Sequence, residues 1–339
     1  MARAGERLLT LRAPGRLHLG FLDPAASLGR RFGSLGLVVD GFETVIELSA
    51  CATDRVSAAS PAAQAQVERA SAHLRTLRQR SDRHQALHLR LLQVLPAHAG
   101  FGSGTQLALA VGRAFARWHG LDLPTVTLAQ WLARGLRSGV GIAGFDQGGL
   151  LIDGGPGADG APAPLLSRLP LPDSWRILVV CDPAHRGLSG AQERQAIAAL
   201  PSLPQAAAAD ICHQVLMRVL PGAACAEFEP FAIGISRVQR LLGAHFAPAQ
   251  GGGAYTSAAV GKLVQWMRDA GGGDGGAATG QSSWGPTGFV IVPSQAQAEA
   301  LVHKARAAGV LDPGLTVHIV GARNHGATVA EHTATAPSP

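Results

Sequence analysis

The hydrophobic and polar positions of the first 50 residues alternate in short runs that glycines separate. The runs lie at 8–11, 16–21, 35–39 and 44–48. Alternation with a period of two places one set of side chains on a buried face, so each run predicts a strand. The chain is therefore expected to open with short antiparallel strands joined by glycine turns.

From residue 62 onward, helical and extended periods follow one another. Apolar residues recur at helical spacing at 62–80, 105–119, 128–136, 190–200, 206–220, 231–242, 256–270 and 295–308. Extended runs lie at 87–95, 149–153, 175–181 and 289–292. Mixed helices and strands in this order are compatible with an α+β protein but do not single out one topology.

Proline-rich and glycine-rich segments predict how the chain divides into domains. Prolines gather at 156–172, which indicates a connection between a first domain at 1–160 and a second at 173–328. The glycine-rich stretch at 271–280 predicts a flexible turn, and residues 329–339 are expected to form a disordered tail.

Composition and charge narrow the class of protein. The chain has 339 residues, of which 47% are hydrophobic, enough to form a substantial core. No apolar run reaches the roughly 18 residues of a membrane span, no signal peptide begins the chain, and the four cysteines lack C-x-x-C spacing. The net charge of +6 comes from scattered arginines with only 5% aromatic residues, which argues against a nucleic-acid partner. We expect a cytoplasmic enzyme with no membrane partner, and a homodimer is left open.

One glycine-rich segment has the composition of an anion-binding loop. It reads P-A-H-A-G-F-G-S-G-T-Q at 96–106, between a predicted strand and a predicted helix. Glycines allow the backbone to approach an anion, and the first amides of a helix are free to donate to it. We expect phosphate binding by Gly100, Gly102, Ser103, Gly104 and Thr105, with Thr105 also a ligand for Mg²⁺. A glycine-rich helix cap is the alternative.

This segment resembles the phosphate-binding motif of the GHMP superfamily of kinases and their relatives. Similar superfamily motifs appear in order as A-P-G-R-L-H-L-G at 13–20, S-G-V-G-I-A-G-F-D-Q at 138–147 and G-Q-S-S-W-G-P-T-G at 280–288. The resemblance implies an α+β protein with a two-lobed GHMP fold. Its N-terminal lobe would be like ribosomal protein S5, its C-terminal lobe ferredoxin-like, and ligands would lie between the lobes.

Departures from the kinase motifs point to one branch of the superfamily. Kinases have G-L-G-S-S-A where this chain has G-S-G-T-Q at 102–106. Together with the runs at 281–287, 134–139 and 187–194, this variant resembles the β-ribofuranosylaminobenzene (or β-ribofuranosylphenol) 5′-phosphate synthase family, which does not use ATP. That resemblance implies transfer of ribose 5-phosphate from phosphoribosyl pyrophosphate to 4-aminobenzoate or 4-hydroxybenzoate. Carbon dioxide and pyrophosphate are lost, and the C-riboside formed serves tetrahydromethanopterin biosynthesis.

Two other functions stay open. The first is an ATP-dependent GHMP small-molecule kinase, and the second is a binding protein without catalytic activity on the same scaffold.

The resemblance also assigns side chains of the N-terminal motifs. Asp146 matches the acidic residue of the kinases, and we expect this catalytic residue on Mg²⁺ or near the developing positive charge, with a loop aspartate that caps backbone amides as the alternative. Arg137 suits a bidentate grip on an anion, with a surface arginine as the alternative. Arg16 and His18 lie on one face of a predicted strand. The resemblance implies that Arg16 binds substrate and that His18 is a catalytic residue. A strand face exposed to solvent is the alternative.

A second group of candidates comes from the later motifs. Ser282, Ser283 and Trp284 are expected to bind substrate, and the indole of Trp284 is suited to stacking on an aromatic acceptor. A structural tryptophan is the alternative. Glu193 is placed near the cleft by the resemblance, but it also suits a helix cap.

Overall fold

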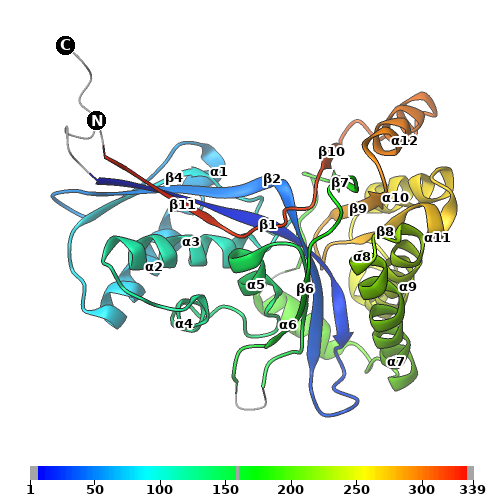
Figure 1. The fold of residues 1–339 in the computed structure, drawn as a ribbon, viewed down its shortest axis with the longest axis horizontal. Coiled ribbons are helices and arrows are strands. Elements are labelled where there is room, and N and C mark those ends of the chain that lie inside the picture. Colours follow the sequence, from blue (N-terminus) through cyan, green and yellow to red (C-terminus); the bar gives the residue numbers. More distant parts are fainter. Residues whose placement is uncertain (1–6, 158–159, 189, 334–339) are drawn as a thin grey trace.

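The chain forms two lobes, each built on one β-sheet, in a computed structural model that describes residues 7–157, 160–188 and 190–333 (Figure 1). The first lobe holds a seven-stranded sheet and the second a four-stranded sheet. Within the described ranges, no helix combines the length and the apolar character needed to cross a membrane.

The first sheet has the strand order β11-β1-β2-β4-β3, and β5 and β6 extend it beside the first half of β2. Bulges between Pro14 and Arg16 and between His18 and Gly20 let β1 continue past its glycines, so two long strands replace the four short runs that the pattern predicted. The strands are β1 (Arg7–Asp23), β2 (Phe32–Ala50), β3 (Arg55–Ala58), β4 (Leu87–Gln93), β5 (Leu150–Asp153), β6 (Leu165–Leu169) and β11 (Thr328–Thr333).

Helices cover one face of this sheet (Figure 1). The central helix, α3, is buried along most of its length, and its Phe115 packs in one core with Leu9 and Leu11 of β1 and Leu89 of β4. The helices of this lobe are α1 (Pro61–Gln64), α2 (Val67–Ser81), α3 (Ser103–Trp118), α4 (Thr125–Trp131) and α5 (Val140–Gln147).

The second lobe has the strand order β10-β7-β9-β8. Its strands are β7 (Arg176–Cys181), β8 (Ala278–Gln281), β9 (Thr287–Val292) and β10 (Thr316–Val320). Helices separate β7 from β8 and β9 from β10, which is the βαββαβ order of a ferredoxin-like fold. The larger helices are α6 (Gly190–Ala199), α7 (Gln205–Gln214), α9 (Phe228–Phe246), α10 (Ala258–Ala270) and α12 (Gln295–Ala307). Shorter ones are the π-helix Val215–Val219, α8 (Leu220–Ala224), the 3-10 helix Ala247–Gln250 and α11 (Gly273–Gly276).

The two lobes share a hydrophobic core. Leu17 and Leu35 of the first sheet lie in one buried cluster with Ile177 and Phe289 of the second and with Phe231 of α9. Burial of apolar surface across the boundary stabilises one arrangement of the lobes and therefore of any site between them.

Two predictions about the course of the chain are wrong, and the boundary of a third shifts. Residues 329–333, expected in a disordered tail, belong to β11 and pair with β1, while 334–339 lie outside the described residues. The proline-rich segment does run between the two lobes, but it contains β6, which pairs with β5 and extends the first lobe past residue 160. The glycine-rich stretch contains α11 and runs into β8, whose residues are buried against β9 and α9. In each case tertiary pairing decides the structure, and local composition does not reveal it.

Candidate active site

A cleft of about 530 Å³ lies where the predicted motifs meet. It is lined by most of the residues that the sequence predicted, namely Gly100, Gly102, Ser103, Gly104, Thr105, Arg16, His18, Arg137, Glu193 and Ser283. These residues come from distant parts of the chain. The fold therefore gathers ten of the predicted site residues around one cavity of a size usual for small-molecule sites.

The glycine loop joins β4 to α3 and places the start of that helix in the cleft. Gly102 is the residue before the helix and has a φ of +73°, a conformation that favours glycine. The backbone N–H groups of Ser103 and Gly104 have no partner among the described residues. Free amides at a helix N-terminus attract anions. This geometry agrees with the predicted phosphate loop.

Gly100 has a structural role in addition to its predicted place in the phosphate loop. Its φ is +95°, and a Cβ there would lie 2.5 Å from the carbonyl oxygen of Ser282. Its own carbonyl accepts hydrogen bonds from Arg16 Nη1 at 2.7 Å and from Ser282 Oγ at 2.8 Å. Gly100 therefore lets the two glycine loops approach each other as well as lining the cleft.

Four arginines line the cleft, Arg16, Arg69, Arg134 and Arg137. Arg16 Nε, Arg134 Nε and Arg137 Nη1 are buried and have no hydrogen-bond partner in the described structure. Burial lowers the pKa of Arg16 to about 10, with Glu193 opposing the shift, so this guanidinium stays charged at neutral pH. Buried donors without partners are costly and rare, which indicates that an anion completes the site.

Two of these arginines were missed from the sequence. Arg134 opens the run at 134–139 that also contains Arg137, but nothing in that run distinguishes its side chain as a ligand. Arg69 is on α2, in a segment with no motif, and only the packing of α2 beside α3 brings it to the glycine loop. No local signal in the sequence marks Arg69 as a site residue.

Glu193 is the only carboxylate among the described residues that line the cleft. Its Oε2 accepts a hydrogen bond from Arg137 Nη2 at 2.7 Å. The ion pair holds the Arg137 guanidinium toward the cleft and leaves the Glu193 carboxylate already paired. The cleft is therefore strongly positive.

His18 lies at one end of the cleft with its imidazole buried. Its Nε2 has no partner among the described residues. Burial first, and then the charges of Arg16 and Arg137, lower the pKa of His18 well below its ordinary value. The imidazole is therefore neutral at neutral pH and can exchange hydrogen bonds without adding charge.

Asp146 does not line the cleft, so the structure does not place it where the predicted catalytic and metal-binding role requires. Gly141, the second residue of α5, lines the cleft, and Gln106 Nε2 donates to the Gly141 carbonyl at 2.9 Å. Asp146 follows five residues later. Five residues rotate the helix by roughly 140°, which turns the side chain away. Its Oδ1 accepts a hydrogen bond from Thr125 Oγ1 at 2.5 Å instead.

A protein-held magnesium ion does not fit these residues. Thr105 lines the cleft, but its predicted fellow ligand Asp146 does not. Across the described residues, no group of three or more His, Cys, Asp or Glu side chains could hold a metal ion. The one acid in the cleft, Glu193, is already paired with Arg137.

Ser282 links the loops and does not line the cleft. Its hydroxyl donates to the Gly100 carbonyl at 2.8 Å and accepts from the His18 backbone N–H at 2.9 Å. The side chain is fully buried. The structure therefore does not place Ser282 in direct reach of a substrate, where its predicted role requires it, and its hydroxyl instead positions residues that line the cavity.

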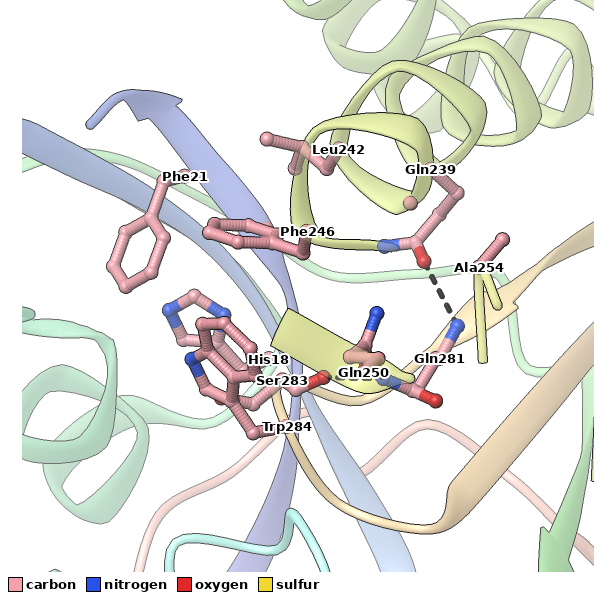
Figure 2. Close-up of a pocket in the computed structure, with 12 residues that line it drawn as sticks. His18, Phe21, Gln239, Leu242, Phe246, Gln250, Ala254, Gln281, Ser283 and Trp284 are labelled. Carbon is pink, nitrogen blue, oxygen red and sulfur yellow. Dashed lines mark hydrogen bonds between the residues drawn. The ribbon is translucent and has the colours of Figure 1, made fainter. Parts of the chain in front are cut away.

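A second, smaller cavity of about 40 Å³ adjoins the cleft, and we call it the side pocket (Figure 2). The two cavities share His18, Phe21 and Ser283. The side pocket is lined by His18, Gly20, Phe21, Gln239, Leu242, Gly243, Phe246, Gln250, Ala254, Gln281, Ser283 and Trp284. Trp284 thus lies in the side pocket, where its ring contacts Phe246 with 4.7 Å between ring centroids.

Fold and cleft together define a protein of the GHMP class, as the motifs predicted. The chain matches the family described as GHMP kinases N terminal domain over residues 67–150 and GHMP kinases C terminal over 228–311. Similar solved structures include homoserine kinase from Cytophaga hutchinsonii, with a TM-score of 0.67 and 15% identity over 97% of this chain and 99% of that one. Mevalonate diphosphate decarboxylase from Enterococcus faecalis gives a TM-score of 0.64 at 17% identity, over 96% of this chain and 100% of that one.

Curated relatives then identify the branch. The chain is 32% identical over 305 residues to a protein named beta-ribofuranosylphenol 5′-phosphate synthase from Archaeoglobus fulgidus, covering 85% of this chain and 89% of the relative. A protein of the same name from Methanothermobacter thermautotrophicus is 27% identical over 335 residues, covering 94% and 98%. The chain belongs to the β-ribofuranosylphenol 5′-phosphate synthase family, a family of pentosyltransferases.

Proposed function

We propose that this protein condenses phosphoribosyl pyrophosphate with 4-hydroxybenzoate or 4-aminobenzoate, releasing carbon dioxide and pyrophosphate, as a step of tetrahydromethanopterin biosynthesis. The observation that carries the proposal is the cleft's combination of four arginines with one carboxylate that is already paired. Such a cleft suits a substrate with several phosphates and a reaction that needs no free acid or base.

The arginines stand on both sides of the glycine loop, which suits a substrate with phosphate at two ends. A Cβ on Gly102 would lie 3.2 Å from Arg16 Cζ. A Cβ on Gly104 would lie 3.6 Å from Arg134 Nη1 and 3.8 Å from Arg69 Nη1. Phosphoribosyl pyrophosphate carries one phosphate on C5 and a pyrophosphate on C1. We assign the two ends to these two arginine groups, with the free amides of α3 between them.

The chemistry balances without a proton acceptor. The bond from C1 of the ribose to the pyrophosphate oxygen breaks, and the electron pair leaves with pyrophosphate. The ring carbon that bears the carboxylate then bonds to C1, and the bond to the carboxyl carbon breaks, which returns its electrons to the ring and releases carbon dioxide. Arginine donors stabilise the charge that develops on the leaving group. Neutral His18, at the end of the cleft, adds no positive charge beside the oxocarbenium-like centre.

A kinase fits the cleft less well. Phosphoryl transfer to an alcohol uses an acid group to accept or orient the hydroxyl proton. The matched acidic residue, Asp146, lies outside the cleft, and Glu193 is committed to Arg137.

Magnesium, in this proposal, enters the cleft on the pyrophosphate of the substrate. Mg²⁺ keeps several waters and is often held by substrate phosphates with few protein ligands. Titration calorimetry with MgCl₂ should therefore show no saturable binding to the protein alone, and binding in the presence of phosphoribosyl pyrophosphate. Saturable binding to the protein alone would contradict this.

One assay tests the function. The purified protein is incubated with Mg²⁺, phosphoribosyl pyrophosphate and carboxyl-labelled 4-hydroxybenzoate or 4-aminobenzoate, and labelled carbon dioxide is counted against a blank without enzyme. Release with at least one acid is expected. No release with either acid would exclude the proposed function. ATP-dependent phosphorylation of a small alcohol would then favour a kinase, and binding without turnover a protein without catalytic activity.

A pair of variants checks that the arginines of the cleft do the binding. Arg134→Met should raise the KM for phosphoribosyl pyrophosphate by about tenfold or more, because it removes a charge-assisted hydrogen-bond donor. The control Arg306→Met makes the same change at an exposed position of α12 and should leave KM unchanged. Equal values for the two variants would place the phosphate site elsewhere.

A further inference from the structure

We propose that the side pocket binds the para substituent of the aromatic acceptor, and that Gln250 in it selects a hydroxyl over an amino group. This inference rests on the proposed function. It adds a residue that determines which acceptor is used.

The volumes of the two cavities, and the residues that line both of them, indicate where the aromatic acceptor binds. The cleft of about 530 Å³ has room for the phosphorylated sugar, whereas the side pocket of about 40 Å³ is too small for a benzene ring. It has room for a substituent with one heavy atom. The ring therefore lies at the junction, against His18, Phe21 and Ser283, which line both cavities. Its carboxylated carbon faces the cleft, and the opposite ring position faces the side pocket.

The walls of the side pocket differ from one end to the other. Phe21, Phe246, Trp284 and His18 gather on one side and the glutamines on the other (Figure 2). His18 and Phe21 pack edge to face with 4.7 Å between ring centroids. An aromatic acceptor packs favourably at the aromatic side, next to the cleft. Its substituent then points toward the glutamine side.

Gln281 uses its whole amide group within the protein, and Gln239 uses its oxygen and one of its two N–H groups. Gln281 Nε2 donates to Gln250 Oε1 at 2.7 Å and to the Ser283 carbonyl at 2.8 Å, and its Oε1 accepts from the Thr256 N–H at 2.6 Å. Gln239 Nε2 donates to the Leu19 carbonyl at 2.6 Å, and its Oε1 accepts from the Gln281 N–H at 2.8 Å.

Gln250 differs from both, because neither of its two N–H groups is used within the described part of the chain. Its Oε1 accepts from Gln281 Nε2 and, at 2.9 Å, from Thr256 Oγ1, which fixes the orientation of the amide. Its Nε2 has no partner among the described residues. The polar side of the pocket therefore offers an N–H donor.

A donor at this position distinguishes the two acceptors. The oxygen of a phenol or phenolate has lone pairs that accept a hydrogen bond. The lone pair of an aromatic amine is delocalised into the ring and accepts poorly, so Gln250 would face the amine donor to donor. A site built to bond a hydroxyl rejects an analogue that cannot supply the partner atom. We therefore expect 4-hydroxybenzoate to be the preferred acceptor.

The experiment measures kcat/KM for 4-hydroxybenzoate and 4-aminobenzoate with wild type, Gln250→Glu and the control Gln265→Glu. Wild type should prefer 4-hydroxybenzoate by about tenfold or more. Glu at position 250 keeps one oxygen for Gln281 and Thr256 but replaces the donor by an acceptor, so the preference should shift toward 4-aminobenzoate by about tenfold or more. Gln265 is exposed on α10, and its variant should keep the wild-type ratio.

The outcomes separate the two proposals. An active wild type whose acceptor ratio is the same in Gln250→Glu would overturn the role of Gln250 and leave the proposed function intact. A wild type inactive with both acids would overturn both. A measurement on wild type alone guards against misfolding of the variant: phenol should inhibit competitively against the acid acceptor about tenfold more strongly than aniline. Equal inhibition would overturn the proposal.

Discussion

Several buried polar atoms without partners gather around the cleft. The set in the described residues includes Arg16 Nε, His18 Nε2, Arg134 Nε and Arg137 Nη1, all on side chains that line the cavity, and His73 Nε2 on the neighbouring helix α2. Such groups lower stability and are retained where a ligand uses them. We therefore expect these unpaired groups to lower the free energy of unfolding of the protein when no ligand is bound.

His73 makes this cost depend on pH. Burial first, and then the charges of Arg134 and Arg69, lower its pKa to about 4 from 6.5. The unfolded state takes up the proton first, so stability present above pH 6.5 is lost as the pH falls, by about 3 kcal/mol at pH 4. His73→Leu should remove most of this loss, measured by urea unfolding at pH 8 and pH 4. The exposed control His303→Leu should keep the wild-type difference between the two pH values, and a similar result for His73→Leu would contradict the prediction.

Gly102 is required for its backbone conformation and for the space beside Arg16. At a φ of +73°, a valine is strained, and its Cβ would lie 3.2 Å from Arg16 Cζ. Gly102→Val should reduce binding of phosphoribosyl pyrophosphate at least about a hundredfold, measured by equilibrium dialysis, while unfolding stays cooperative.

A second glycine provides the control for Gly102. Gly120, after α3, has a φ of +63°, and no atom lies within 4 Å of the position that a Cβ would take there. Gly120→Val should therefore lose stability through backbone strain but keep its affinity for the substrate. If the two variants lost affinity equally, strain alone would explain the effect and the loop would not be the phosphate site.

At the scale of elements, the sequence predicted those whose own pattern is strong. Helix α3 and the strands β4 and β7 carry apolar residues at the right period, and their predicted positions agree with the structure within a few residues. β3, β6 and β11 are short, with few buried side chains, and form because neighbouring strands supply their partners. No local pattern distinguishes such segments from loops.

β11 supplies the edge of the first sheet. It pairs with β1 from Arg7 to Arg12, beside the buried Leu9 and Leu11. Ending the chain after Ala327 leaves β1 without this partner and should lower the free energy of unfolding by about 2–4 kcal/mol relative to a chain ending after Thr333. Thermal and urea unfolding of the two chains measure the difference. Equal free energies of unfolding for the two chains would show that the pairing of β11 with β1 does not stabilise the fold.

At the scale of the whole molecule, the site depends on how distant segments meet. The motifs grouped the glycine loop, Arg16 and Ser283 correctly because family resemblance carries tertiary information that periodicity lacks. The resemblance matched Asp146 by its motif alone, and the phase of α5 turns that side chain away from the cleft. Arg69 and Gln250 reach the two cavities only through the packing of their elements, so no reading of the sequence could select them.

The junction of the lobes at Ser282 provides the last prediction. Its hydroxyl bonds the Gly100 carbonyl of one loop and the His18 N–H of β1, and both contacts cross between the second lobe and the first. Ser282→Ala leaves the buried His18 N–H without this partner and should lower the free energy of unfolding by about 1–3 kcal/mol. Because the same bonds position Gly100 and His18, the KM for phosphoribosyl pyrophosphate should rise as well. The exposed control Ser202→Ala should change neither value. A Ser282→Ala protein with lower stability but unchanged KM would mean that this junction holds the lobes together without positioning the site.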